Sequence, residues 1–539
     1  METEDFDYVI VGSGSAGAVL ANRLSADPGN RVLVLEAGGT DRRFFIQMPI
    51  GYGRTFHDAR VNWRYHTEPV PGLNGRPSYW PRGKVMGGSS SINAMVYVRG
   101  HPQDFSDWAA AAPGWGWEDV APAYRRLECW EGPASPERGA DGPLAVRDIA
   151  DEVHPLCGVY LAAAREAQLP YTPDYNGAEM EGASIYQITT RGGLRASTAR
   201  CYLRPAMTRP NLALRTHALA CEVLMEEGRA TGLRYRWRGQ ERVARARASV
   251  VLAAGAINSP QLLQLSGIGP GDLLQAHGIE TRRHNVHVGA HLQDHLGLDH
   301  LYEARVPTLN QVLRPWLGRL RVGLDFVFRR RGPLTLSINQ GGGFVRSSPE
   351  LRAPDIQLYF SPVSYTRAPP GTRPMLLPDP FPGFLLGHSP CRPTSEGHLA
   401  IRSPDPTMAP AIQPNYLDTE EDRALMRTGD RMLRRIAETP ALSGIIARKI
   451  LPEIDDTSDD AIDDYARNHG WSVFHACGTC RMGADPEAAV TDPRLRVHGV
   501  AGLRVVDASA FPNITSGNIN APVIMLAERA AEMILADHR

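Results

Sequence analysis

The N-terminal stretch constrains the fold more than any other part of the chain. Residues 7–11 read as a buried strand, residues 18–24 carry an apolar helix pattern, and residues 31–36 form a second strand that ends in Glu36. The turn between the first strand and the helix is Gly12-Ser13-Gly14-Ser15-Ala16-Gly17. Its glycines allow the backbone to approach a pyrophosphate at the helix N-terminus, and Glu36 would accept a hydrogen bond from a ribose hydroxyl. The pattern predicts a βαβ dinucleotide-binding unit and does not separate FAD from NAD.

More than one domain is expected, because 539 residues are too many for a single core. Residues 249–255 and 503–509 are apolar strands placed to join the N-terminal sheet, while residues 305–450 hold alternating and aromatic stretches typical of an antiparallel sheet. We predict an α/β fold in which a Rossmann-like nucleotide-binding domain carries an α+β substrate cap on an antiparallel sheet. The nucleotide domain is expected to use residues 1–155, 196–304 and 465–539, and the cap residues 156–195 and 305–464.

Bulk properties exclude several classes of protein. A net charge of −1 offers no basic field for nucleic acid. The acidic N-terminus does not resemble a secretion signal, and no apolar run reaches the roughly 18 residues of a spanning helix. Seven scattered cysteines favour reduced thiols and a cytoplasmic location. Peripheral contact with a membrane stays open.

Two segments near the C-terminus carry catalytic chemistry. His475 begins the stretch His475-Ala476-Cys477-Gly478-Thr479-Cys480, and Asn520 lies in Gly517-Asn518-Ile519-Asn520-Ala521-Pro522. A histidine can accept a proton near neutral pH, and an amide can hold an oxygen. A histidine and a hydroxyl differ by about 9 pKa units, on the order of 12 kcal/mol, so the site must stabilise an alkoxide or the proton and hydride must leave nearly together.

Two internal loops complete a family pattern. Residues 82–93 form a glycine-serine loop, and residues 255–269 form a strand-to-helix turn. Together with the N-terminal fingerprint and the two C-terminal segments, they resemble the glucose-methanol-choline (GMC) oxidoreductase family, in the choline dehydrogenase-related branch of FAD-dependent alcohol dehydrogenases. That resemblance covers nearly the whole chain and implies a flavoprotein.

The resemblance implies a role for each matching position. FAD would contact Gly12, Gly14, Ser15, Ala16, Gly17 and Glu36 at its adenosine and pyrophosphate end, Ser89, Asn93, Ala94 and Val96 at its flavin and ribityl region, Val223 at the adenine, and Asp507, Ala508, Asn520 and Pro522 on the late strand and helix. The late acidic strand favours FAD over NAD. His475 corresponds to the catalytic base, and Asn520 to the second catalytic position. Ile92 occupies the place where some members attach flavin through a histidine, so non-covalent FAD is expected.

The expected reaction is oxidation of a primary alcohol to an aldehyde, with hydride passing to the flavin and the proton to His475. The partners are the alcohol and an electron acceptor, which is a quinone, another acceptor or oxygen. Gln340 precedes a Gly-Gly-Gly-Phe segment. The resemblance to choline-type members implies a glutamate at this place, so the uncharged Gln340 favours a neutral alcohol. The alternatives are a choline dehydrogenase, an oxygen-using alcohol oxidase, an FAD-containing hydroxynitrile lyase, or a flavin-binding protein without turnover.

Two clusters invite a metal interpretation that we do not adopt. His284, His287, His291 and His295 are closely spaced, but their loop resembles one in the family that holds no metal. Cys477 and Cys480 form a C-x-x-C without a second ligand pair, so we interpret them as structural. No metal is expected.

Overall fold

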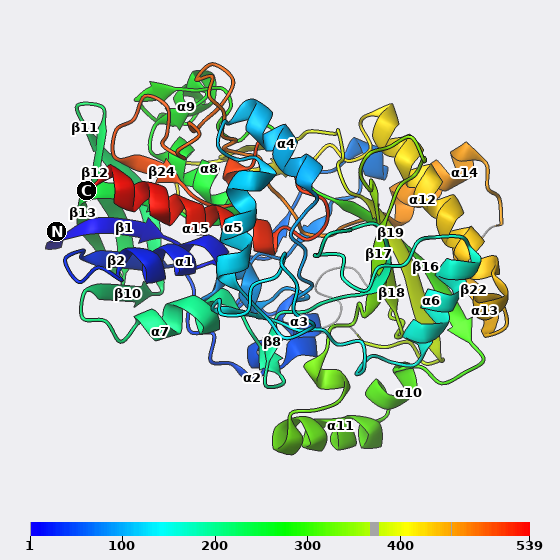
Figure 1. Cartoon of the computed structure of the whole chain (residues 1–539). Coiled ribbons are helices and arrows are strands. Elements are labelled where there is room, and N and C mark those ends of the chain that lie inside the picture. Colours follow the sequence, from blue (N-terminus) through cyan, green and yellow to red (C-terminus); the bar gives the residue numbers. More distant parts are fainter. Residues whose placement is uncertain (1, 367–376, 454, 539) are drawn as a thin grey trace.

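A computed structural model describes residues 2–366, 377–453 and 455–538 of the chain. Two large sheets lie side by side in this structure (Figure 1). The first sheet has the strand order β10-β2-β1-β13-β12-β11, with β24 paired to β13. Its strands are β1 (Glu2–Val11), β2 (Val32–Glu36), β10 (Leu212–Thr216), β11 (Ala218–Glu226), β12 (Arg229–Trp237), β13 (Gln240–Leu252) and β24 (Leu503–Val505).

The first sheet is a parallel nucleotide-binding sheet with an antiparallel edge. Strands β10, β2, β1, β13 and β24 run parallel, and β12 and β11 add antiparallel pairs. Helices α1 (Ser15–Leu24) and α15 (Asn520–Asp537) pack together and bury most of their residues. Burial on both faces explains why β1 and β2 read as continuous apolar runs. The predicted Rossmann-like sheet is confirmed.

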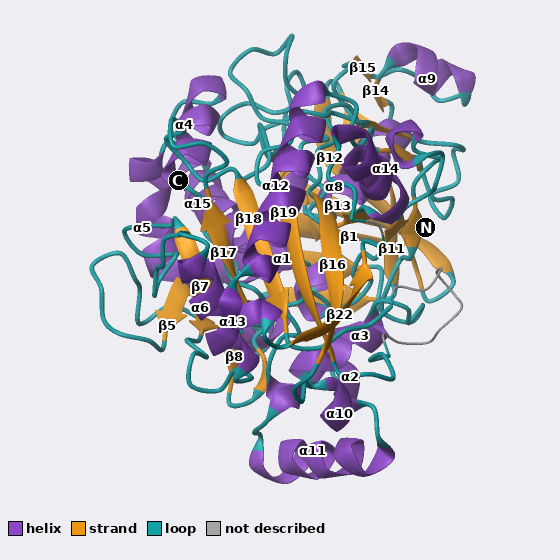
Figure 2. Cartoon of the chain, turned by 90° about the vertical axis from the view of Figure 1, so that its right-hand side faces the viewer, coloured by secondary structure: helices purple, strands orange, loops and turns teal. Residues whose placement is uncertain are grey.

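The second sheet is antiparallel throughout, in the order β22-β16-β19-β18-β17-β7, with β23 paired to β16. Its strands are β7 (Gly182–Ile185), β16 (Leu296–Ala304), β17 (Gly341–Val345), β18 (Ile356–Ser361), β19 (Gly383–Pro390), β22 (Ile446–Leu451) and β23 (Trp471–Ser472). Helices α6 (Leu156–Glu166), α12 (Glu420–Glu438) and α13 (Pro440–Ser443) lie along it (Figure 2). The predicted antiparallel cap is present.

Alternate residues of this sheet face opposite ways. On β16, His300 hydrogen-bonds Asp430 of α12 and Tyr302 joins the apolar cluster under α6 and α12. Asp299 and Leu301, which alternate with these two residues along the strand, line a cavity on the other face. The two-residue period of a strand therefore separates a packed face from a binding face.

Two strands lie in a different sheet from the one predicted for them. Residues 296–304 were expected in the nucleotide domain, but β16 is a central strand of the second sheet. Residues 471–472 were also assigned to the nucleotide domain, and as β23 they pair with β16. Almost every residue of β16 is buried, as in the parallel strands of the first sheet. The sequence pattern therefore does not reveal which of the two sheets this strand joins.

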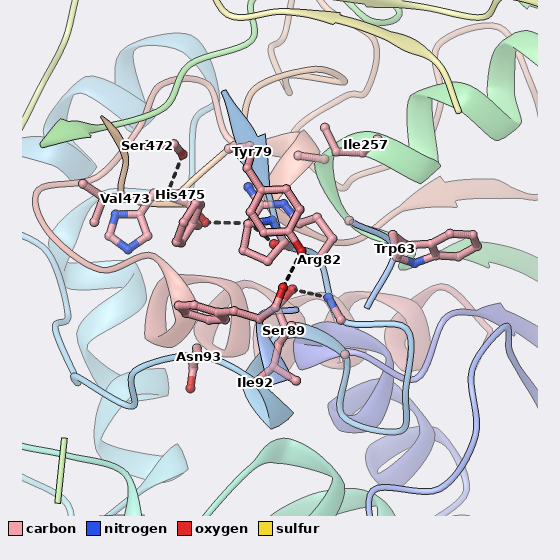
Figure 3. Close-up of a pocket in the computed structure, with 18 of the residues that line it drawn as sticks. Trp63, Tyr79, Arg82, Ser89, Ile92, Asn93, Ile257, Ser472, Val473 and His475 are labelled. Atoms are coloured by element: carbon pink, nitrogen blue, oxygen red, sulfur yellow. Dashed lines mark hydrogen bonds between the residues drawn. The ribbon is translucent and has the colours of Figure 1, made fainter. Parts of the chain in front are cut away.

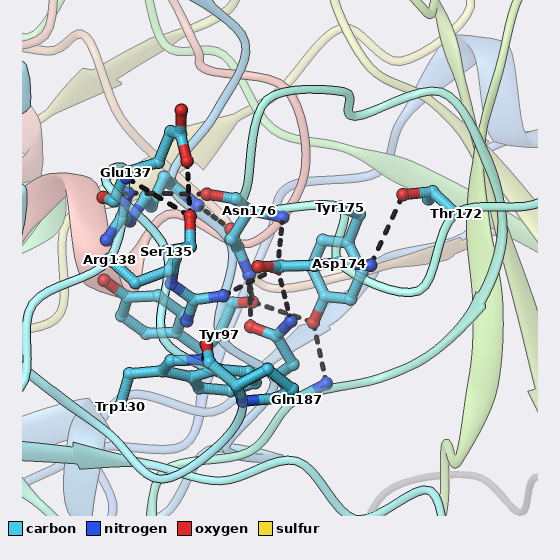
Figure 4. Close-up of polar contacts among 12 residues, drawn as sticks. Tyr97, Trp130, Ser135, Glu137, Arg138, Thr172, Asp174, Tyr175, Asn176 and Gln187 are labelled. Carbon is cyan, nitrogen blue, oxygen red and sulfur yellow. Dashed lines mark hydrogen bonds and ion pairs between the residues drawn. The ribbon is translucent and has the colours of Figure 1, made fainter.

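A buried polar cluster ties the 128–187 excursion to the loop after Tyr97 (Figure 4). Glu128, fully buried, pairs with both Arg99 and Arg138. Arg138 also reaches Asp174 at 2.6 Å, and Asn176 donates to Gln187 at 2.8 Å. Two guanidinium groups around one carboxylate compensate a charge that burial alone would make costly.

The remaining elements are short or peripheral. They are α2 (Phe44–Gln47), α3 (Tyr52–Thr55), α4 (Pro102–Ala111), α5 (Trp117–Leu127), α7 (Arg204–Ala206), α8 (Gly255–Leu265), α9 (Gly271–Ala276), α10 (Asn310–Leu313), α11 (Trp316–Arg329), α14 (Asp459–His469), β3 (Tyr65–His66), β4 (Tyr79–Trp80), β5 (Glu128–Trp130), β6 (Leu144–Val146), β8 (Thr190–Arg191), β9 (Leu194–Arg195), β14 (Ile268–Gly269), β15 (Arg283–His284), β20 (His398–Ala400) and β21 (Ala411–Gln413). Within the described ranges, no helix is both long enough and apolar enough to cross a bilayer.

Candidate active site

A cavity of about 1030 Å³ lies between the two sheets. The ends of β1 and β2, the loop over residues 76–96 and the segment 468–476 all contribute to its lining. Figure 3 shows Arg82 and Tyr79 between His475 on one side of the cavity and Trp63 on the other. One continuous cavity thus joins the nucleotide fingerprint to the histidine segment.

The fingerprint glycines differ in what they do. Gly12 has φ +92°, and a Cβ there would lie 2.6 Å from the Ala253 carbonyl oxygen. A Cβ on Gly17 would lie 1.9 Å from the Gly12 carbonyl oxygen, so Gly17 serves the packing of α1 against the turn. Gly14 caps α1 without a side-chain hydrogen bond and lines the cavity. The free N–H groups at the start of α1 therefore suit a phosphate.

Two carboxylates hold the loops around the nucleotide end. Glu36 accepts from the N–H and hydroxyl of Ser13, at 3.0 and 2.7 Å, and from Gly38 N at 2.7 Å. Asp507 accepts from Gly255 N at 2.8 Å and from Ser259 Oγ at 2.6 Å, at the start of α8. Burial raises the pKa of both groups despite these bonds. Both line the cavity, and each carboxylate retains lone pairs for ligand hydroxyls.

Most predicted cofactor residues line this cavity. These are Gly12, Gly14, Ser15, Ala16, Glu36, Ser89, Asn93, Ala94, Val96, Asp507, Ala508 and Asn520. Three predicted residues do not: Gly17, Pro522 and Val223. Val223 is fully buried and its N–H donates to Ser266 Oγ at 2.8 Å, so this N–H is not available to the adenine. Residues 218–220, earlier on β11, line the cavity instead.

His475 is a buried residue held through both its backbone and its ring. Its backbone N–H donates to Asp294 Oδ1 at 2.6 Å, and its Nδ1 lies 2.8 Å from His295 Nδ1. His295 Nε2 in turn lies 2.8 Å from the Cys391 carbonyl oxygen. Because a carbonyl only accepts, His295 must carry its proton on Nε2. Its Nδ1 then accepts from His475 Nδ1–H, which leaves the lone pair of His475 on Nε2.

The lone pair of His475 Nε2 accepts a hydrogen bond from an amide. Asn518 Nδ2 lies 3.1 Å from His475 Nε2, and Asn518 Oδ1 accepts from Gln357 Nε2 at 3.3 Å. The Gln357 contact fixes which end of the Asn518 amide donates. A proton acceptor and an N–H donor therefore lie side by side in the cavity wall, and a substrate hydroxyl that binds here replaces the contact between them.

The electrostatic surroundings keep this base neutral. Burial is the main cause that lowers the pKa of His475 well below 6.5, and His295 and Arg82 lower it further. Burial also lowers the pKa of His295 to about 4. Both rings are therefore uncharged at neutral pH, as the hydrogen-bond chain requires.

Asn520 lies elsewhere in the cavity. Its Oδ1 accepts from Ser15 Oγ at 2.7 Å, which joins the first residue of α15 to the first residue of α1. The sequence-based choice of Asn520 as the oxygen-binding amide therefore does not fit the geometry, which brings Asn518 to His475. Asn520 remains in the lining at the nucleotide end.

Arg82 supplies a cation to the cavity wall. Its Nη1 donates to the Phe474 carbonyl oxygen at 2.8 Å, while its buried Nη2 has no partner within the described part of the chain. Burial lowers the pKa of this guanidinium. A donor left without an acceptor in the lining suits an electron-rich ligand group.

Sequence reasoning missed Asn518 and the role of His295. The sequence contains a signal for each of them. Asn518 stands two positions before Asn520 in the same segment, and His295 belongs to the histidine cluster that was considered, and rejected, as a metal site. His287 and His291 contact each other at 2.9 Å, and His291 pairs with Glu396. No cluster of metal-ligating side chains is found across residues 2–366, 377–453 and 455–538. Cys477 and Cys480 are buried free thiols.

The comparisons with known proteins agree with this architecture. Family models described as GMC oxidoreductase match residues 6–297 and 393–527. The chain therefore belongs to the GMC oxidoreductase family, as predicted.

Individual relatives cover the full length of the chain. It is 42% identical over 98% of its length to an alcohol dehydrogenase [acceptor] of Pseudomonas putida, covering 96% of that protein. It is also 42% identical over 98% of its length to the mitochondrial choline dehydrogenase of Homo sapiens, covering 90%. A crystal structure of pyridoxine 4-oxidase from Mesorbium loti superposes with a TM-score of 0.88 at 32% identity, covering 99% of both chains.

Proposed function

We propose that this chain is an FAD-dependent alcohol dehydrogenase that oxidises a primary alcohol to an aldehyde, with His475 as general base and Asn518 as the amide that holds the substrate oxygen. The observation that carries the proposal is the neutral His475 Nε2 beside Asn518 Nδ2 in the cavity that also contains the nucleotide fingerprint. Relatives named alcohol dehydrogenase [acceptor] and choline dehydrogenase support the reaction class.

The residues of the cavity fit FAD. The uncapped N-terminus of α1 would hold the pyrophosphate, Glu36 a ribose hydroxyl, and the loop of Ser89 and Asn93 the flavin region. Ile92, buried beside this loop, offers no nucleophile, so attachment is non-covalent. When bound, FAD supplies the acceptor for the hydride that leaves the alcohol carbon.

The protein contributes a proton acceptor and an orienting donor. The substrate hydroxyl donates its proton to His475 Nε2, while His295 holds the Nδ1–H of the same ring. Asn518 Nδ2 then donates to the oxygen as negative charge develops there. Arg82 raises the cost of a charged His475, so the alcohol proton is best transferred while the adjacent oxygen is stabilised.

The structure changes the reason for expecting a neutral alcohol as substrate. Gln340 lies outside the cavity lining, and its Oε1 accepts from His154 N at 2.8 Å, so it cannot report on the substrate charge. The lining around His475 is largely apolar and includes Val473, Leu301 and Leu385. This surface supports a neutral primary alcohol.

Choline is the second candidate. Asp299 places a carboxylate in the lining, and the rings of Tyr79, Trp471 and Phe474 are also there. A carboxylate and aromatic faces are the groups that bind a quaternary ammonium. Steady-state rates of the wild type and of Asp299→Asn with choline, benzyl alcohol and octanol separate the two. If Asp299→Asn raises KM for choline alone, choline is the substrate. If the substitution leaves all three rates unchanged and octanol is the preferred substrate, the substrate is a neutral alcohol.

Anaerobic mixing of the holoprotein with an alcohol tests the reaction class. Bleaching of flavin absorbance is expected, because hydride transfer reduces the flavin. Aldehyde release from a cyanohydrin without bleaching identifies a lyase instead, and a stable yellow protein that reacts with neither is a flavin carrier. Reoxidation of the bleached protein by a quinone, but only slowly by oxygen, supports a dehydrogenase over an oxidase.

A further inference from the structure

Helix α11 (Trp316–Arg329) is the most exposed apolar element of the structure. Figures 1 and 2 both show it at the edge of the molecule, beside α10. Only Val322 and Phe326 of α11 are buried. Six large apolar side chains are exposed, from 46 to 78%: Trp316, Leu317, Leu320, Leu324, Val327 and Phe328. Six neighbouring apolar side chains on one surface helix are more than the scattered exposure of an ordinary soluble surface.

These six side chains share one face. At about 100° per residue they fall within an arc of about 120°, and Val322 and Phe326 lie on the opposite side. On that opposite side, the ring of Phe44 of α2 packs against Phe326 at 5.9 Å, so α11 is held to the molecule through its buried side. The exposed face is therefore an organised strip and not the by-product of a poorly packed helix.

Arginines surround the strip. Residues 314–331 contain six arginines, all exposed, and one acid, Asp325, in a chain whose whole net charge is −1. Arg319 and Arg321 flank the apolar arc on the helix, and Arg329, Arg330 and Arg331 follow at its end. An apolar face bordered by cations is the pattern of helices that lie at a lipid–water interface with anionic headgroups.

We propose that α11 is an interfacial helix that docks this protein, parallel to the surface, on a bilayer containing anionic lipids. The six apolar side chains enter the boundary between headgroups and acyl chains, and the arginines contact lipid phosphates. Charge complementarity favours this partner over a second copy of the chain, since an α11–α11 contact would bring two basic segments together.

Co-sedimentation with vesicles tests the proposal on the purified holoprotein. Vesicles of phosphatidylcholine with about a third phosphatidylglycerol should bind the protein at low salt, and pure phosphatidylcholine vesicles should bind it more weakly. Binding to the anionic vesicles should decrease as salt rises, because the arginine contribution is screened. Absence of binding to anionic vesicles at low salt would overturn the proposal.

Matched variants locate the surface. Leu320→Glu with Leu324→Glu should weaken binding at least about a hundredfold, because two apolar contacts are replaced by charges that anionic lipid repels. Arg319→Gln with Arg321→Gln should weaken it about 25-fold, and only on anionic vesicles. Met207→Glu with Val286→Glu alters two exposed apolar side chains away from α11 and should leave binding unchanged.

Two results contradict the assignment. Equal binding of the wild type and the Leu320/Leu324 variant, with unchanged circular dichroism, moves the membrane contact elsewhere. The second result is a wild-type protein that does not bind vesicles and is a dimer in sedimentation equilibrium. If the Leu320/Leu324 variant is then a monomer, the apolar face contacts a second copy of the chain. The readouts do not use enzymatic activity, so they stand apart from the proposed reaction.

Discussion

Two buried histidine pairs lie on opposite sides of the second sheet, and they differ in what holds the ring. His295 and His475 form a chain that begins at the Cys391 carbonyl and ends at Asn518 in the cavity. On the other face, His300 Nε2 contacts Asp430 Oδ1 at 2.6 Å, and Arg434 contacts Asp430 Oδ2 at 2.7 Å. Neighbouring His388 is fully buried, and neither ring nitrogen has a partner among the described residues.

The comparison shows how surroundings decide the use of an imidazole. A carboxylate beside a ring occupies the nitrogen that faces it, whereas a backbone carbonyl accepts from one nitrogen and so fixes the tautomer of a neutral ring. Burial would raise the pKa of Asp430, but His300 and Arg434 hold it at about 2. The pair at the cavity is bound to a carbonyl at one end and to a neutral amide at the other, and a substrate hydroxyl can displace that amide from the His475 Nε2 lone pair. Only that pair is built as a base.

The largest effect should come from removing the base. His475→Ala should slow anaerobic flavin reduction by at least about a hundredfold, because no neighbouring group replaces a positioned proton acceptor. Stopped-flow absorbance measures the rate. His388→Phe is the matched control from the other pair and should change the rate by less than about twofold. Equal losses in the two variants would mean that the effect is structural.

The two asparagines should separate next. Asn518→Ala should lower the rate of flavin reduction by about 10²–10³, the scale of losing one donor to a developing oxyanion. Asn520→Ala removes a contact to Ser15 instead and should mainly weaken FAD retention, measured as flavin content after gel filtration. The reverse outcome restores Asn520 as the catalytic amide.

His295 should act through the pH profile. Because His475 is active when neutral and its pKa lies well below 6.5, flavin reduction in the wild type should be independent of pH from about 6 to 8. His295→Asn removes one of the causes that lower this pKa, so the acid limb should move upward, with a rate loss of about tenfold to a hundredfold. If His295→Asn reduces flavin more slowly but the acid limb of its pH profile does not move, His295 has only a packing role.

The smallest effect concerns stability. Burial lowers the pKa of His388 to about 3. Between about pH 6.5 and 3 this histidine is therefore protonated in the unfolded chain and neutral in the folded chain, which lowers the free energy of unfolding as pH falls. The contribution is complete above pH 6.5 and falls as pH drops. At pH 5 the loss amounts to about 2 kcal/mol, and His388→Phe should lose less stability than the wild type between pH 7.5 and 5 by that amount. Urea unfolding at both pH values gives the difference, and identical losses in the two proteins contradict it.

Sequence patterns predicted the parts that depend on local chemistry. The N-terminal strand–turn–helix and the strands at 249–255 and 503–509 follow from apolar runs and glycine turns, so the first sheet and the base His475 were accessible. Tertiary contacts were not. Whether Asn518 or Asn520 faces His475 depends on where α15 starts, since the first helical residue turns toward α1. His295 gains its role from a residue 180 positions away. The Gln340 amide and the Val223 N–H are likewise occupied by hydrogen bonds to residues distant in sequence.

The alternation along β16 has a consequence for how this protein can diverge. Asp299 and Leu301 reach the cavity because they are out of phase with His300 and Tyr302. Deleting one residue within β16 would invert the strand beyond that point, driving the Asp299 carboxylate under α12 and exposing an imidazole to substrate. Specificity in such a protein should therefore drift by replacement at alternate sites, and insertions should be confined to the loops that connect the strands.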